Sequence, residues 1–490
     1  MQYGFVIDHD SCIGCHACTV ACKAENDVPV GNFRTWVKYT EEGTFPDIKR
    51  DFLVQRCNHC SDAPCVTICP VNALEKRPDG IVDLDRDACI GCRACMQACP
   101  YDAIYLNEDS GAAEKCHFCA HRVEVGLEPA CSVVCPVNAI IAGDLDDPDS
   151  RVARLSRERE TVVRRPEQET NPNVRYIGAS DLALNPGRAA RPDMYMFSER
   201  PPAKPEAWPA DAPLTPNARV VLDAGHRVEW GWPVALYLVT KGIAAGVAML
   251  APLAGRLGLT GNAGRIAPEV IALIFLAVTC FLLVEDLARP MRFYRLITRP
   301  NWKSWLVRGG VLLGVFGAVV AATLGLRLAG MDAAADAGRW LGAALGVGVA
   351  GYTAFLFGQC KGRDLWESPL LLPHLIAQAL MCGSAVFLAF TGRHTALGLV
   401  FVIGVLGHLA FALIERRGRH ETENARQAAA FLSVVRLWGI PAYAGGLIVG
   451  GAVALALLAA WPAGVIVPTL LGLYLYEHAY VRAAQLPPLS

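Results

Sequence analysis

The chain has 490 residues, of which 53% are hydrophobic, with a mean hydropathy of +0.31 and a formal net charge of -1. This length exceeds one ordinary domain, and the apolar composition excludes a purely water-soluble protein. The charge gives no indication of a nucleic-acid partner, because the basic residues are spread along the chain and form no single patch.

The N-terminus runs directly into a cysteine motif. Residues Met1–Phe5 contain neither the charged segment nor the apolar segment of an export signal, and no twin-arginine motif follows them. We therefore expect that nothing in this chain exports its own N-terminus.

Cysteine is concentrated near the N-terminus. Sixteen of the 19 cysteines lie between residues 12 and 135, and the other three, Cys280, Cys360 and Cys382, lie in apolar stretches. A disulfide framework is one explanation of dense cysteines, but it is typical of short secreted chains, and here the spacing repeats. The pattern favours metal ligation.

The sixteen cysteines form four groups. The first and third have the x2, x2, x3 spacing of bacterial ferredoxins, and the second and fourth widen the middle gap but keep the CxxC start and the CxxxCP end. Zinc is the alternative for a CxxC pair, but zinc needs only four ligands and gains nothing from a displaced fourth cysteine before proline. The predicted ligands are Cys12, Cys15, Cys18 and Cys22; Cys57, Cys60, Cys65 and Cys69; Cys89, Cys92, Cys95 and Cys99; and Cys116, Cys119, Cys131 and Cys135.

Composition divides the chain into three zones. The cysteine-rich domain covers residues 1–150, an apolar region covers residues 231–490, and between them residues 151–230 hold 10 of the 31 prolines and many arginines. This middle zone is expected to be a mostly irregular or extended linker.

Eight apolar runs follow the linker, each about long enough to cross the roughly 30 Å of membrane hydrocarbon as a helix. Buried helices of a soluble protein are the alternative, but eight such runs would need an implausibly large soluble core. The runs lie near residues 234–255, 266–285, 306–329, 340–360, 370–390, 395–415, 437–460 and 463–481.

An even number of spans places both ends of the apolar region on the face that carries the cysteine domain. The loops on this face contain 14 lysines and arginines, whereas the opposite loops contain five. The positive-inside bias then predicts a cytoplasmic location for the cysteine domain. The alternative is that some of these arginines bind a partner or the cysteine domain itself.

Residues 1 to about 180 resemble the four-cluster ferredoxin-like subunits of the complex iron–sulfur molybdoenzymes, such as dimethyl sulfoxide reductase and polysulfide reductase. The resemblance rests on the four groups, on the segment Gly126–Cys131, and on three copies of Cys-Pro-(Val/Tyr)-(Asn/Asp)-Ala that begin at Cys69, Cys99 and Cys135. It implies four [4Fe–4S] clusters, because all sixteen ligand positions are cysteine.

The resemblance also implies how the groups exchange their fourth cysteines. Each cluster would take three cysteines from one group and the last cysteine of another. The implied sets are Cys12, Cys15, Cys18 and Cys135; Cys116, Cys119, Cys131 and Cys22; Cys57, Cys60, Cys65 and Cys99; and Cys89, Cys92, Cys95 and Cys69.

Residues 232 to about 482 resemble the polysulfide reductase (NrfD-like) membrane anchors. The resemblance rests on the segments Trp230–Gly246, Glu285–Pro290, Gly351–Tyr352 and Leu365–Pro369. It implies a quinone-reactive membrane domain without haem, with the pocket near the face that meets the iron–sulfur subunit.

Five residues are candidates for the quinone site. Lys241 lies inside the first span, where an ionisable group needs a partner or a function. Glu285 and Asp286 are possible partners of Lys241, and Tyr237 and Tyr352 could hydrogen-bond a quinone carbonyl. The alternatives are a structural ion pair or a snorkelling lysine, and interfacial anchoring for the tyrosines.

Two histidines, His374 and His408, stand alone on their spans. Haem b would require histidine pairs at matching depth, so the favoured interpretation is a core or interface histidine in each case, with a quinone, proton or haem role as the alternative.

The predicted architecture is an α+β bis-ferredoxin-like domain with four clusters, followed by an all-α membrane bundle of about eight transmembrane helices.

No dinucleotide, flavin or substrate motif is present, so we expect the chain alone not to convert a substrate. The resemblance implies electron exchange between a molybdenum or tungsten bis-pterin catalytic subunit and quinone in a bacterial or archaeal cytoplasmic membrane, with sulfite or formate oxidation as examples. The alternatives are an electron-transfer or proton-translocating module of another respiratory complex, hydrogenase-linked or quinol-oxidising, and a transporter with a ferredoxin-like regulatory head.

Overall fold

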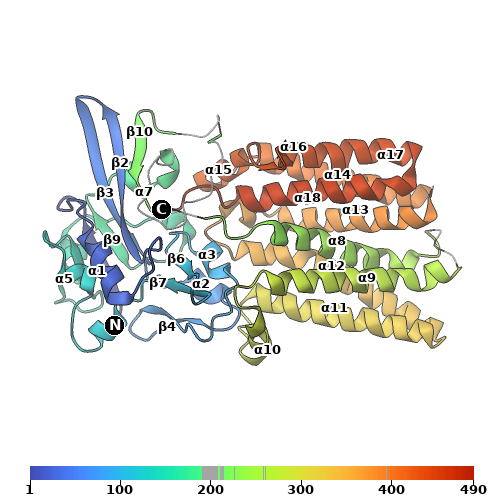
Figure 1. The fold of residues 1–490 in the computed structure, drawn as a ribbon, viewed down its shortest axis with the longest axis horizontal. Coiled ribbons are helices and arrows are strands. Elements are labelled where there is room, and N and C mark those ends of the chain that lie inside the picture. Colours follow the sequence, from blue (N-terminus) through green and yellow to red (C-terminus); the bar gives the residue numbers. More distant parts are fainter. Residues whose placement is uncertain (190–207, 210–213, 226, 258, 260, 393) are drawn as a thin grey trace.

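The computed structural model describes residues 1–189, 208–209, 214–225, 227–257, 259, 261–392 and 394–490. The chain is elongated, with a mixed α/β domain at one end and a bundle of long helices at the other (Figure 1). The predicted division into an α+β domain followed by an all-helical region is confirmed.

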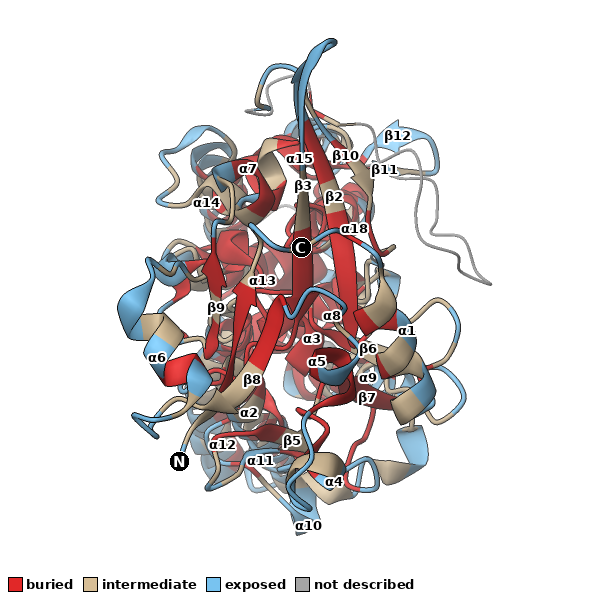
Figure 2. Ribbon diagram, turned by 90° about the vertical axis from the view of Figure 1, so that its left-hand side faces the viewer, coloured by how far each residue is buried: buried red, intermediate tan, exposed pale blue. Residues whose placement is uncertain are grey.

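The N-terminal domain is built on two three-stranded sheets and two hairpins. In the first sheet β1 (Tyr3–Asp8) lies between β8 (Ile140–Asp144) and β9 (Val174–Ile177), and in the second β2 (Thr35–Thr44) lies between β10 (Ala218–Leu222) and β3 (Asp47–Arg56). β1 is antiparallel to β8 and parallel to β9. The hairpins pair β4 (Leu74–Lys76) with β5 (Val82–Leu84), and β6 (Ile104–Asn107) with β7 (Ala112–Lys115). Most of β1, β2 and β9 is buried, and Figure 2, viewed from this end of the molecule, shows buried stretches along β2, β3 and β9.

Short helices connect the strands of this domain, and each carries or borders cysteines of one group. They are α1 (Ala17–Asn26), α2 (Pro64–Ile68), α3 (Ala94–Ala98), α4 (Ala120–Val123) and α5 (Ala130–Val133).

The predicted linker contains more regular structure than its composition suggests. It contributes α6 (Arg151–Glu158), β9, α7 (Asp181–Leu184) and β10, and both strands complete sheets of the N-terminal domain. Arg164 and Arg165 are buried because each has polar partners: Arg164 Nη1 donates to Gln55 Oε1 at 2.8 Å, and Arg165 Nη2 to both carboxylate oxygens of Asp364 at 2.7 and 2.8 Å. The proline run at residues 201–205 lies outside the described residues.

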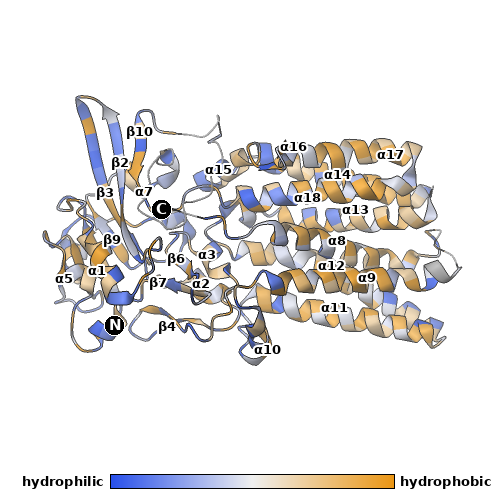
Figure 3. Cartoon of the chain, viewed as in Figure 1, coloured by the Kyte–Doolittle hydropathy of each residue, from blue (hydrophilic) through white to orange (hydrophobic). Residues whose placement is uncertain are grey.

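The apolar region forms a bundle of long helices, whose hydrophobic residues contrast with the more hydrophilic N-terminal domain (Figure 3). Its helices are α8 (Trp232–Leu250), α9 (Gly261–Glu285), α11 (Trp305–Leu328), α12 (Asp332–Gly358), α13 (Leu371–Thr391), α14 (Thr395–Arg417), α16 (Ala442–Leu447), α17 (Ala454–Ala460) and α18 (Ile466–Ala483). A π-helical turn, Ile448–Val453, joins α16 to α17.

Seven spans of the described chain are long and apolar enough to cross a membrane, compared with the eight runs that the sequence predicts. The eighth run forms α18, which is not among the seven but packs against α8, α13 and α16 inside the bundle. It is less apolar because it carries Glu477, His478 and Arg482, and Glu477 is buried among the neighbouring helices. With α18 in place, the chain enters and leaves the bundle at the end that meets the N-terminal domain (Figure 1).

Two glycines allow α8 and α13 to cross closely. A Cβ atom on Gly246 would lie 1.8 Å from the carbonyl oxygen of Ala379, and one on Gly383 would lie 2.3 Å from the carbonyl carbon of Gly246. Small residues at such crossings let helix backbones approach within a membrane.

We predict that Gly246→Ala destabilises the bundle by about 1–3 kcal/mol, because the added methyl group forces the two helices apart. The measurement is the midpoint of thermal unfolding in detergent. Gly314→Ala on α11 is the matched control, since a Cβ there meets open space and should leave the midpoint unchanged. Equal midpoints for the two variants would contradict the close crossing.

Candidate functional site

The first and third cysteine groups share the same local geometry. Each begins with Cys-Ile-Gly-Cys, and the glycines, Gly14 and Gly91, have φ angles of 69° and 71°. A residue with a Cβ is strained in this region, so glycine permits the tight turn that brings two cysteines to one side. The following helix, α1 or α3, then carries the third cysteine of the group, Cys18 or Cys95.

The fourth cysteine of each group lies near cysteines of a different group. Cys12 is close to Cys135, and Cys22 is close to Cys119 and Cys131. Near the bundle, Cys99 is close to Cys57, and Cys69 is close to Cys92. None of the 19 cysteines forms a disulfide.

A small cavity lies at one of these groupings. Its lining includes Cys22, Cys116, Cys119 and Cys131. Within the described residues, no three side chains of histidine, cysteine, aspartate or glutamate lie close enough to hold a single metal ion. Four cysteines set around a cavity fit a cluster larger than one ion, and they do not fit the compact tetrahedron of a zinc site.

The buried Arg56, at the end of β3, faces the same cavity and adds a positive charge to it. Its Nη1 donates to Cys131 Sγ at 3.2 Å, while Nε and Nη2 have no hydrogen-bond partner among the described residues. Burial raises the pKa of Cys18 to about 11 and that of Cys22 to about 12, and the charge of Arg56 opposes both shifts. Arg56 therefore favours the thiolate forms that iron binds.

The second and third cysteine groups lie against the helical bundle. Asn301, between α10 (Arg295–Thr298) and α11, donates to the carbonyl oxygen of Cys69 at 2.8 Å. Arg363, after α12, donates to Gln97 Oε1 at 2.8 Å, and Gln97 Nε2 donates to Gln485 Oε1 at 3.0 Å. These contacts join the C-terminal segment, the α12–α13 loop and α3.

Aromatic rings extend from the third cysteine group into the bundle. Trp230 Nε1 donates to the carbonyl oxygen of Cys92 at 3.3 Å. The Trp230 ring stacks on Trp366 and Phe357, with centroids 5.6 and 6.0 Å away, and these two rings stack on each other at 4.5 Å. Cysteines of both groups and Tyr237 of α8 belong to one continuous apolar core.

Five arginines of the connecting loops bind the N-terminal domain: Arg289, Arg292, Arg295, Arg299 and Arg363. Some of the positive charge in these loops therefore holds the N-terminal domain on the bundle. This is the alternative to the positive-inside explanation that the sequence left open.

Three of the five candidate quinone residues lie together. Lys241 Nζ donates to Thr353 Oγ1 at 2.6 Å and to the carbonyl oxygen of Ala350 at 3.0 Å, and it lies 4.9 Å from the centroid of the Tyr352 ring. Tyr237 is buried close to Tyr352 and Thr353.

Glu285 and Asp286 do not join this cluster. Glu285 is exposed, and Asp286 Oδ1 lies 3.7 Å from Arg93 Nη1 in the N-terminal domain. Burial raises the pKa of Asp286 to about 6, although Arg93 opposes the shift. The carboxylate whose charge acts on Lys241 is Glu477 of α18, which is not among the residues predicted from the sequence. It could have been noticed as an acidic residue inside an apolar run.

The two histidines that stand alone on their spans meet in the structure. His374 Nε2 lies 2.8 Å from His408 Nδ1, because α13 and α14 are neighbouring helices. Both rings are buried.

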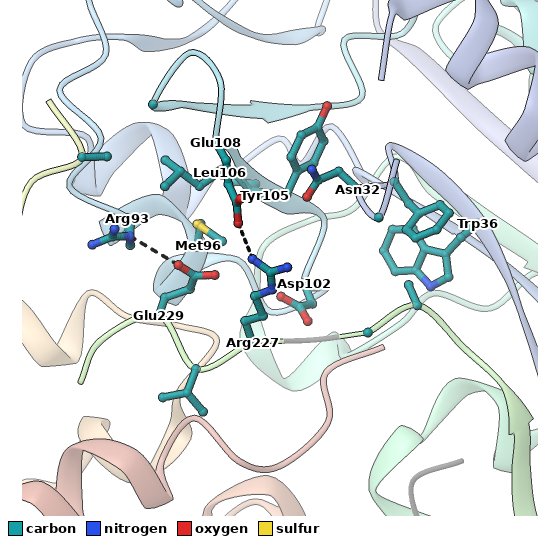
Figure 4. Close-up of a pocket in the computed structure, with 18 residues that line it drawn as sticks. Asn32, Trp36, Arg93, Met96, Asp102, Tyr105, Leu106, Glu108, Arg227 and Glu229 are labelled. Carbon is teal, nitrogen blue, oxygen red and sulfur yellow. Dashed lines mark hydrogen bonds and ion pairs between the residues drawn. The ribbon is translucent and has the colours of Figure 1, made fainter. Parts of the chain in front are cut away.

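A polar cleft of about 410 Å³ lies where the third cysteine group meets the segment before α8 (Figure 4). Arg93 pairs with Glu229 at 3.3 Å, and Arg227 pairs with Glu108 at 2.5 Å. Charged side chains that pair across a cleft are unlike the mostly apolar lining that a quinone requires.

Comparisons with known proteins cover both halves of the chain. Two models of 4Fe-4S dicluster domains match residues 11–74 and 48–145, and the model described as polysulphide reductase, NrfD, matches residues 220–473.

Relatives of the N-terminal domain are components of reductases. The tetrathionate reductase component of Salmonella typhimurium is 44% identical over 195 residues, covering 38% of this chain and 78% of the relative. The arsenate respiratory reductase iron-sulfur subunit ArrB of Shewanella sp. is 38% identical over 225 residues, covering 36% and 96%. The polysulfide reductase component of Wolinella succinogenes is 37% identical over 176 residues, covering 35% and 92%.

The NrfD model spans more than half of the chain, and the remainder matches dicluster domains and components of reductases. The chain therefore belongs to the NrfD polysulphide reductase family and joins its multi-pass membrane domain, in one polypeptide, to an electron-transfer domain of the 4Fe-4S dicluster type.

Proposed function

We propose that this protein passes electrons between a molybdenum or tungsten bis-pterin catalytic subunit and the membrane quinone pool. The observation that carries the proposal is the continuous apolar core that contains the second and third cysteine groups together with Tyr237 of the first span. A shared core holds the cysteine loops and the membrane domain at a fixed separation.

Within this proposal, four [4Fe–4S] clusters are held by the four cysteine sets that the resemblance implies. The cross-group proximities and the cavity lined by Cys22, Cys116, Cys119 and Cys131 support these sets. When bound, such clusters supply one-electron transfer. The chain itself fixes the cysteines, excludes water from most of them and sets the charge around them.

The quinone site is proposed at Tyr237, Lys241 and Tyr352. The Tyr237 hydroxyl and the Lys241 ammonium are donors suited to quinone oxygens, and Thr353 holds Lys241 in place. Tyr237 shares an apolar core with the third cysteine group and lies near Cys360 at the end of α12, so a quinone there would be close to that group.

The catalytic partner is proposed to dock at the far end of the N-terminal domain. Cys15 is exposed there, and large apolar side chains around the first and fourth cysteine groups are also exposed: Ile13, Val20, Val125, Leu127 and Val133. Clustered exposed apolar residues mark protein interaction sites. The similar proteins are components of reductases, which supports a partner that holds the catalytic centre.

The N-terminal domain is proposed to lie on the cytoplasmic side, on the basis of the excess of loop cations. A cytoplasmic catalytic partner favours oxidation of a substrate such as sulfite or formate with reduction of quinone.

We predict that Arg56→Gln lowers the reduction potential of the clusters bound by Cys18 and Cys131. Reduction adds negative charge, which the buried guanidinium stabilises, so its loss should shift the electron-exchange equilibrium by about tenfold or more, or about 59 mV for one electron. The measurement is a redox titration followed by electron paramagnetic resonance. Arg56→Lys retains the charge and should retain most of the potential; unchanged potentials in Arg56→Gln would exclude the tuning role.

The quinone site is tested by Lys241→Met and Tyr237→Phe. Each removes a proposed donor to a quinone oxygen, so quinol-driven reduction of the clusters should slow by about tenfold or more, with cluster content unchanged. The measurement is anaerobic stopped-flow absorbance of the full chain in detergent. Tyr474→Phe, at a partly exposed tyrosine of α18, is the control. Wild-type kinetics in both test variants would remove these residues from the site.

A further inference from the structure

We propose that six buried residues of the bundle form a proton relay between the proposed quinone site and water on the side of the iron–sulfur domain. This inference rests on the proposed quinone chemistry and adds the route of its protons. The buried relay consists of Glu415, His374, His408, Gln378, Glu477 and Lys241, from α14, α13, α18 and α8.

All six side chains of the buried relay are hidden from lipid and solvent, with exposed fractions between 0% and 5%. Ionisable groups inside a membrane are costly and are kept for structural pairing or for function. Structural pairing occurs elsewhere in this bundle: Glu269 and Arg339 form a direct ion pair, with oxygen–nitrogen distances of 2.5 and 3.0 Å.

Lys241 and Glu477 lack such direct pairing. In the described parts of the chain, no opposite charge lies within 4.0 Å of either group. Lys241 is satisfied by an alcohol and a carbonyl group, and Glu477 accepts a hydrogen bond from the amide of Gln378. Groups held by neutral partners can gain or lose a proton without breaking an ion pair.

The distances from Glu415 to Glu477 within the buried relay are short, and the charge of Glu477 acts on Lys241 from more than 4.0 Å away. Glu415 Oε2 lies 4.0 Å from His374 Nδ1, and His374 Nε2 lies 2.8 Å from His408 Nδ1. Gln378 Nε2 lies 3.3 Å from His374 Nε2 and 2.7 Å from Glu477 Oε1. Gln378 does not titrate, so it is a positioning residue that holds the carboxylate of Glu477 beside the histidine pair.

The hydrogen-bond pattern assigns the protons of the two rings. His374 Nε2 lies 2.8 Å from His408 Nδ1 and 3.3 Å from the Gln378 amide. Its one lone pair accepts from the nearer donor, His408 Nδ1–H, when His408 carries its proton on Nδ1. The proton of His374 then lies on Nδ1, which faces Glu415. A histidine with carboxylate and imidazole neighbours offers one donor and one acceptor ring nitrogen, which is the pair of functions that a proton relay uses.

One end of the buried relay lies near the surface beside the iron–sulfur domain, and the other end lies at the proposed quinone site. Glu415 is in the last turn of α14, at the end of the bundle that meets the iron–sulfur domain, and the partly exposed Ser368 approaches its carboxylate. At the other end, Lys241 lies beside Thr353 and Tyr352 of the proposed quinone site.

The chemistry requires such a route. Reduction of one quinone consumes two electrons and two protons, and oxidation of one quinol releases the same numbers. The electrons arrive or leave through the iron–sulfur domain, and the protons move between the quinone oxygens and the water near Ser368 through Lys241, Glu477, the histidine pair and Glu415.

The test uses the full chain in detergent, with added quinol and cluster absorbance as the probe. Glu477→Gln and His374→Ala should each slow cluster reduction by about tenfold or more, because a proton-transfer group is lost. Quinol affinity, measured by titration, should remain within twofold of wild type. Added imidazole should restore the rate of His374→Ala, which a purely structural role does not predict.

Two further variants keep the test decisive. Glu477→Asp retains a titratable group and should be faster than Glu477→Gln, and Glu269→Gln makes the same change in a carboxylate outside the buried relay and should react like wild type. Wild-type rates in both Glu477→Gln and His374→Ala, or slow rates with lost quinol affinity and no rescue, would overturn the relay. If the wild-type clusters were not reduced by quinol at all, the proposed function would fail instead.

Discussion

The docking of the second and third cysteine groups onto the membrane domain is the constraint on which the rest of the structure depends. Asn301 binds the carbonyl oxygen of Cys69, Trp230 binds that of Cys92, and Arg363 and Gln485 both bind Gln97. Because these bonds surround a shared apolar core, the two domains meet as a packed unit. Without this contact, neither the cysteine loops nor the proposed quinone site would have a fixed neighbour.

Lipid imposes the second constraint, because it forces polar groups of the spans toward the interior of the bundle. The side chains of Lys241, Glu477, His374 and His408, which come from α8, α18, α13 and α14, are consequently buried. The same burial that makes these groups costly also separates them from competing water. The proposed electron path at the docking face and the proposed polar path inside the bundle both lead to the group of Tyr237, Lys241 and Tyr352, which is the arrangement that coupled electron and proton exchange requires.

Local patterns in the sequence predict much of this architecture. The features that these patterns do not predict depend on contacts between segments far apart in the sequence. The CxxC spacing predicts the cysteine groups because adjacent residues build each loop. By contrast, the His374–His408 contact depends on which helices are neighbours, and Lys241 is nearer Glu477 than Asp286 because α18 lies inside the bundle. Hydropathy underrates α18 because its Glu477 is buried among other helices. The arginine-rich linker contains strands because β9 and β10 pair with β1 and β2, which lie far away in the sequence.

The central claim is that electrons pass between clusters held by the sixteen cysteines and a quinone in the membrane domain. Its most direct test is the electron paramagnetic resonance spectrum of anaerobically purified protein before and after addition of quinol, together with iron, zinc and acid-labile sulfide analysis. The account predicts equal amounts of iron and sulfide and the appearance of reduced-cluster signals on adding quinol. Bound zinc without iron or sulfide, or clusters that dithionite reduces but quinol of sufficiently low potential does not, would contradict it.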